Sequence, residues 1–193
     1  MKFGKSGAGL PEIERLFIRL FLVPIVRIAM NWTISRLLIK REVNIIKKLL
    51  CNVSIKNLQQ KMSIDRTFAI EDNSRQFSVN EVLEHLVIAG TLVKEVITSL
   101  SQEKNVDFDI KIENVKPKEN KENQLNNFLE FYEDYDKFIK DLPKKQSKMT
   151  KAHPWFVKFN NFDWNTFMFM HTFIHRRQIQ AILKELKRFE NEY

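Results

Sequence analysis

Two of the four histidines in this chain stand four residues apart near its C-terminal end, at His171 and His175. In a helix, residues at this spacing project from one face. The apolar pattern turns that face toward the core, and His85 lies on the apolar stripe of an earlier predicted helix. Three neutral imidazoles suit a divalent ion such as Zn²⁺, Ni²⁺ or Fe²⁺ and leave one coordination position open. The pattern predicts a catalytic metal site, although Thr172 stands where the metalloprotease motif has its general-base glutamate.

Two polar residues lie one helical turn from these histidines. Gln178 follows His175 by three positions, and Glu81 precedes His85 by four. Metal-bound imidazoles normally donate their second N–H to an oxygen, so either residue is a candidate to orient a ligand. For Glu81 we favour a role in capping its own helix. The spacing alone leaves open a core in which the histidines are buried with hydrogen-bond partners and no metal.

Four segments with helical periodicity must position these side chains. Apolar residues recur at spacings of three and four over residues 42–62, 79–101, 124–142 and 161–189. Ser78 with Glu81, and Asn160 with Asp163, are signals for the start of a helix. A long crossover separates the second and third segments, which favours an all-α four-helix bundle. Within this crossover, residues 106–113 alternate apolar and polar side chains, and we expect an extended segment along the bundle.

The charge is concentrated at the front of the chain. The 193 residues carry a formal net charge of +8, and residues 1–61 hold twelve Lys or Arg against three acids, a net of +9. The composition, 44% hydrophobic and 29% charged, is that of a globular domain. The single cysteine, Cys51, excludes an intramolecular disulfide and favours a reducing, cytoplasmic location.

Residues 1–40 form a basic, apolar N-terminal extension, distinct from the bundle of residues 41–193. Arg19, Arg27 and Arg36 interrupt its apolar run and exclude a transmembrane helix, and Pro24 is expected to kink or end a helix there. We expect an additional helical segment that packs on the body or on a second subunit. The alternative is an interfacial segment, within residues 10–40, on an anionic membrane. Nucleic-acid binding is not expected, because bulky aliphatic residues separate the basic ones and no reader motif is present.

Two motifs in the chain point to a known family. One lies near the C-terminus and consists of His153-Pro154-Trp155-Phe156, Trp164, His171, His175 and Gln178. The other is the run from Phe77 to Leu86, FSVNEVLEHL, which contains His85. Over residues 41–190 the chain resembles the DinB/YfiT-like superfamily. The resemblance implies an up-down-down-up four-helix bundle that forms a homodimer. It also implies a divalent metal, zinc, nickel or iron, on His85, His171 and His175, with His153 not a ligand.

The resemblance also implies a type of reaction. Some members transfer a low-molecular-weight thiol to electrophiles, because a metal lowers the pKa of the thiol. We therefore expect a metal-dependent transferase or hydrolase that acts on a small-molecule substrate, with Trp155, Trp164 and Phe167 as candidate pocket residues. The chain departs from the family pattern at Val157-Lys158, where a glycine is usual, and in its N-terminal extension. The alternative function is a non-catalytic metal-binding or stress-response interaction module, membrane-associated through residues 10–40.

Overall fold

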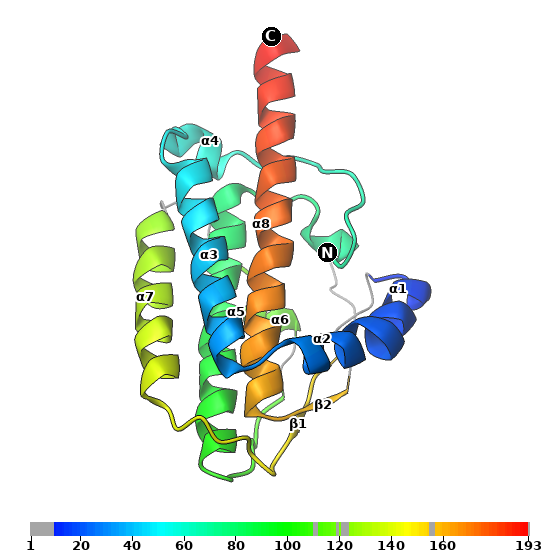
Figure 1. Cartoon of the computed structure of the whole chain (residues 1–193). Coiled ribbons are helices and arrows are strands. Elements are labelled where there is room, and N and C mark those ends of the chain that lie inside the picture. The colour runs from blue at the N-terminus through cyan, green and yellow to red at the C-terminus, as the bar shows by residue number, and fades with distance from the viewer. Residues whose placement is uncertain (1–9, 110–111, 119, 121–123, 155–156, 193) are drawn as a thin grey trace.

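The apolar stripes of the sequence fold as long helices that pack side by side. The computed structural model describes residues 10–109, 112–118, 120, 124–154 and 157–192. Its long helices are α3 (Trp32–Leu50), α5 (Val79–Ser101), α7 (Leu125–Asp141) and α8 (Asn161–Glu192). Both α8 and α7 pack against α3 and α5. Figure 1 shows α3 and α8 running in one direction and α5 and α7 in the opposite direction. The all-α class predicted from the sequence is confirmed.

The predicted starts of the two helices that carry the histidines, α5 and α8, are confirmed. Ser78 accepts a hydrogen bond from the Glu81 amide at 3.1 Å, and the Glu81 carboxylate accepts one from the Ser78 amide at 2.8 Å. Asn160 and Asp163 exchange the same pair of bonds at the start of α8, at 3.0 and 3.2 Å. Each box satisfies amide groups that have no partner within the helix, and so fixes where α5 and α8 begin.

The predicted helix over residues 42–62 was wrong at both ends. Asn31 accepts hydrogen bonds from two amides of the first turn, so α3 begins ten residues earlier and crosses residue 40. The helix ends at Leu50, and Ser54 caps a separate short helix, α4 (Ile55–Gln59). Asn52 and Ser54 compete for backbone hydrogen bonds, which favours a break and a new start over one long helix.

The extended segment predicted over residues 106–113 was wrong at its C-terminal end, because α6 (Ile112–Val115) is helical. Residues 106–109 form neither helix nor strand, and Val106 and Phe108 pack against the core. Residues 110–111 lie outside the described part. The structure instead has a short antiparallel pair, β1 (Lys151–Ala152) and β2 (Lys158–Phe159), just before α8. With two residues each, these strands are too short to give a period-two signal.

The N-terminal part of the chain forms a helical arm beside the bundle. We call residues 12–29 the N-terminal segment; it comprises α1 (Glu12–Phe17), the π-helical turn η1 (Ile18–Leu22) and α2 (Val23–Ala29). Pro24 lies at the start of α2, and the backbone stays helical through it. Figure 1 shows α1 and α2, in dark blue, at the edge of the molecule beside α8. No helix in the described residues is long and apolar enough to cross a membrane.

Two ion pairs attach the N-terminal segment to the body. Arg27 binds both carboxylate oxygens of Asp163, at 3.1 and 2.8 Å, and donates to the Lys158 carbonyl at 2.7 Å. Glu14 binds Arg66 at 2.8 Å and accepts from the Ala69 amide at 3.2 Å. The bidentate geometry of Arg27 fixes α2 against the start of α8.

A buried ion pair joins the two helices that run in the same direction, α3 and α8. Arg176 donates to Glu42 at 2.6 Å, and Glu42 is only 3% exposed. We predict that Glu42→Leu lowers the free energy of unfolding by about 2 kcal/mol, because Arg176, which is partly buried and also donates to Gln180, loses its carboxylate partner. Chemical denaturation measures this loss. The double variant Glu42→Leu/Arg176→Leu should recover most of it, and additive losses would contradict the prediction.

Candidate metal centre

Three histidines from two helices meet at one point inside the protein. His85 lies on α5, and His171 and His175 lie on α8. The Nε2 atom of His171 is 3.1 Å from the Nε2 atom of His85 and 3.1 Å from that of His175. Two ligands at tetrahedral angles around Zn²⁺ stand about 3.3 Å apart if each bond is about 2.05 Å. The three-histidine cluster (His85, His171 and His175) is therefore close enough to hold a metal ion.

The outer ring nitrogens of two of these histidines have oxygen partners. The Nδ1 atom of His85 lies 2.7 Å from the Val115 carbonyl oxygen at the end of α6. A carbonyl only accepts, so Nδ1 must carry the proton. Its Nε2 atom then presents a lone pair to the centre of the cluster. This is the second-contact arrangement that orients metal-binding imidazoles.

Gln178 fixes His175 in the same way, as its position on the helix predicted. The Gln178 side-chain oxygen lies 2.6 Å from Nδ1 of His175, and its amide nitrogen donates to the Ser74 carbonyl at 2.7 Å. The bond to Ser74 identifies which end of the amide is the nitrogen, so the oxygen faces the histidine. Nδ1 of His175 therefore donates, and its Nε2 atom also presents a lone pair to the centre.

His171 cannot satisfy the cluster by itself. Its Nδ1 atom is buried and has no hydrogen-bond partner among the described residues. If the His171 proton sits on Nε2, one N–H faces the lone pairs of both His85 and His175, and the Nδ1 atom of His171 has no donor. If it sits on Nδ1, three lone pairs face one another. Either arrangement leaves a buried polar atom unsatisfied, which costs free energy. A cation at the centre removes the conflict among the Nε2 atoms, so the residues fit a metal ion.

The surroundings keep all three imidazoles neutral. Burial lowers the pKa of His85, and burial together with the neighbouring histidines lowers the pKa of His171 well below its ordinary value. Burial, and then His85, lowers the pKa of His175 to about 3. Near pH 7 the rings are therefore neutral, which is the protonation state that metal binding requires.

The other predicted site residues lie around the cluster in different roles. Glu81 is in the helix cap and pairs with Lys61 at 2.7 Å, in agreement with the role we favoured. Trp164 is fully buried, and its ring packs edge-on against Phe167. The His153 ring lies tilted against Phe167, with ring centroids 4.5 Å apart, and burial lowers the pKa of His153 to about 3. Trp155, with Phe156, lies outside the described residues.

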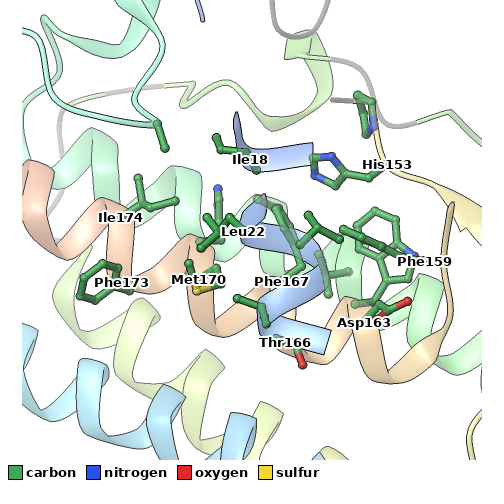
Figure 2. A pocket seen from close by; sticks show the side chains of 18 of the residues that line it. Ile18, Leu22, His153, Phe159, Asp163, Thr166, Phe167, Met170, Phe173 and Ile174 are labelled. Atoms are coloured by element: carbon green, nitrogen blue, oxygen red, sulfur yellow. The ribbon is translucent and has the colours of Figure 1, made fainter. Parts of the chain in front are cut away.

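A cavity of about 720 Å³ includes the three-histidine cluster in its wall. Figure 2 shows Ile18 and Leu22 of the N-terminal segment among its lining side chains, together with Phe167 and Met170 of α8. Trp164 also lines it, as the sequence predicted. The volume of the cavity is within the range of small-molecule sites, and such sites combine apolar walls with a few convergent polar groups.

Comparisons with known proteins give no further guide to this site. No protein family, curated protein or solved structure matches the chain. The function is therefore inferred from the histidines and the cavity.

Three parts of the site were missed by sequence reasoning. The carbonyl groups of Val115 and Ser74 come from connecting segments, and a backbone acceptor leaves no signal in side-chain types. The part of the cavity wall formed by Ile18, Leu22 and Val26 does leave a pattern in the sequence, because these apolar residues recur every four positions. Bulky apolar residues between these positions hide it, because they make the segment apolar on all sides.

The two predicted orienting residues can be told apart by substitution. Gln178→Leu removes the acceptor of His175, and we predict that it weakens zinc binding by roughly 10-fold to 100-fold. Competition with a chromophoric chelator measures the affinity. Glu81→Ala is the control: loss of the cap should cost about 1 kcal/mol of stability and leave zinc affinity unchanged. Equal zinc affinities in both variants would contradict the orienting role of Gln178.

Proposed function

We propose that this chain is a metal-dependent enzyme of the DinB-like type that acts on a small electrophile. In this proposal His85, His171 and His175 hold a divalent zinc, nickel or iron ion. The reaction is either transfer of a low-molecular-weight thiol or hydrolysis. The observation that supports it most strongly is the convergence of three neutral imidazoles, two of them with fixed Nδ1 partners, on the wall of a small-molecule cavity.

The arrangement of the helices supports the DinB-like assignment. The order of helix directions, read along α3, α5, α7 and α8, is up, down, down, up (Figure 1). The first histidine comes from the second long helix, and the pair comes from the fourth. Both features agree with what the resemblance of residues 41–190 implies.

The residues around the cluster have separate tasks in the proposed reaction. A divalent ion supplies Lewis-acid chemistry, since it lowers the pKa of a water or thiol that it binds. The Val115 carbonyl and Gln178 keep the imidazoles of His85 and His175 in the correct tautomer. The apolar walls exclude water, which strengthens electrostatic interactions at the cluster.

The cavity also limits the class of substrate. Side chains such as Leu22, Val93, Phe167 and Met170 make much of its wall apolar, with the histidines as a polar group. A ligand that fits this wall is a small, mostly apolar molecule with its reactive polar group directed at the cluster. A strongly charged substrate would lose its hydration without compensation over the apolar part of the wall.

Metal analysis of His171→Ala tests the proposed site. We predict about one equivalent of transition metal in the unmodified protein and almost none in the variant, with a lower melting temperature after metal loading. His153→Ala is the matched control, because this ring lies beside the cavity and outside the cluster. Equal metal content in the unmodified protein and His171→Ala, or loss of metal only in His153→Ala, would overturn the site.

A separate assay distinguishes an enzyme from a non-catalytic metal-binding module. We predict that the metal-loaded protein accelerates the displacement of chloride from an activated aryl chloride by a thiol, which forms the thioether and releases chloride and a proton. A chelator should abolish the acceleration. Leu22→Trp, which fills the cavity from the N-terminal segment, should lower the rate with metal content unchanged. A protein that binds metal but shows neither thiol transfer nor hydrolysis of activated esters would be assigned to the module.

A further inference from the structure

The side of the N-terminal segment that faces away from the bundle is strongly apolar. Seven large apolar residues there are between 49% and 89% exposed, and we call them the outer face: Ile13, Leu16, Phe17, Leu20, Phe21, Ile25 and Ile28. The rings of Phe17 and Phe21 stack on each other, with centroids 5.7 Å apart. Soluble proteins rarely expose a contiguous apolar patch of this kind unless it binds something.

The outer face contacts the body through one edge-on ring pair, Phe17 with Phe68 at 6.1 Å between centroids, and its seven residues stay about half exposed or more. The opposite side of the same helices contacts the body. Ile18, Leu22 and Val26 line the cavity there, and Glu14 and Arg27 form the ion pairs with the body. In a helix these inner positions recur every four residues, so the outer residues between them point away. The outer-face residues are therefore exposed even though the N-terminal segment is folded and attached to the body.

The net charge of the N-terminal region favours one kind of partner for the outer face. Residues 1–41 contain eight Lys or Arg and two acids, a net of +6, whereas residues 62–193 carry 20 Lys or Arg against 21 acids, a net of −1. Part of this charge is paired within the protein: Glu12 lies 3.5 Å from Arg15, Glu14 binds Arg66, and Arg27 and Arg36 bind Asp163 and Asp136. A second copy of the chain would bring together two N-terminal regions of the same net charge, which is unfavourable. An anionic lipid surface offers both apolar depth and opposite charge.

The geometry fits binding along a membrane surface. Eighteen helical residues extend about 27 Å, close to the thickness of a hydrocarbon core. However, Arg15, Arg19 and Arg27 lie within this length, and no helix in the described part of the chain can span a membrane. A helical segment with an exposed apolar side and arginines along its length lies in the interface instead.

We propose that the outer face of the N-terminal segment docks on an anionic membrane surface with its helices parallel to the bilayer. The cavity lies directly behind this segment, because Ile18, Leu22 and Val26 form part of its wall. Docking therefore places the cavity next to lipid. The proposal stands on exposure and charge, and it holds whether or not the histidines bind a metal.

Flotation of the full chain with vesicles tests the proposal. We predict binding to vesicles of phosphatidylcholine with phosphatidylglycerol, much weaker binding to phosphatidylcholine alone, and weakening of the first by salt. Phe17→Ser/Phe21→Ser should reduce the bound fraction at least tenfold, and Arg19→Glu should reduce binding to the anionic vesicles. The matched control is Leu37→Ser/Ile55→Ser, because these residues are similarly exposed, at 55% and 60%, outside the N-terminal segment. The control should bind like the unmodified chain.

Three outcomes would overturn the proposal. They are absence of vesicle binding by the unmodified chain, equal binding to neutral and anionic vesicles, and equal loss in the control variant. Sedimentation without lipid tests the main alternative, which is that the outer face binds a second copy of the chain. A dimer that Phe17→Ser/Phe21→Ser dissociates, in a chain that does not float, would assign the outer face to a second copy. Circular dichroism and metal content of each variant separate loss of the surface from loss of the fold.

Discussion

Two hydrogen bonds from imidazole Nδ1 atoms to oxygen acceptors determine how the three-histidine cluster is arranged. They hold the Nε2 lone pairs of His85 and His175 at one point, where His171 adds a third nitrogen. Without them each ring could turn or change tautomer, and the cluster would satisfy itself as ordinary buried histidines do. With them, the cluster has more lone pairs than protons at its centre. The structure therefore contains an unsatisfied polar group of atoms inside the protein, close enough together to hold a metal ion.

The connecting segments have a functional place in this arrangement. The crossover between α5 and α7 joins two helices that run in the same direction, so it must return along the bundle, and it brings the Val115 carbonyl to His85. The segment between α4 and α5 brings the Ser74 carbonyl to Gln178. Both acceptors are backbone atoms at fixed points of the chain. Their positions depend on the packing of the crossover and the loop, so the chemistry of the site is coupled to the stability of these segments.

Periodicity was enough to predict the helical class, the starts of α5 and α8, and the two helices that carry the histidines. Those signals are local: a cap is set by residues three apart, and a buried face by spacings of three and four. The start of α3 was missed because Asn31 lies inside an apolar run whose basic residues suggested a separate extension. The partners of Arg27 and Glu42 were missed for another reason. Asp163 and Arg176 are more than 130 residues away, and no local pattern encodes such a pairing.

The N-terminal segment shows how one helical arm can serve two environments. Its inner side is apolar because it closes the cavity, and its outer side is apolar as well, which leaves few positions for anchoring. Arg27 and Glu14 supply that anchoring through bidentate or doubly bonded contacts near either end of the arm. Between these ends the buried side chain of Ile18 and the packing of Val23 against the core also hold the inner side of the arm. Contact with an apolar surface outside the arm would therefore act on the same residues that shape the cavity inside, and Ile18 and Leu22 are the side chains through which that effect would reach the cavity.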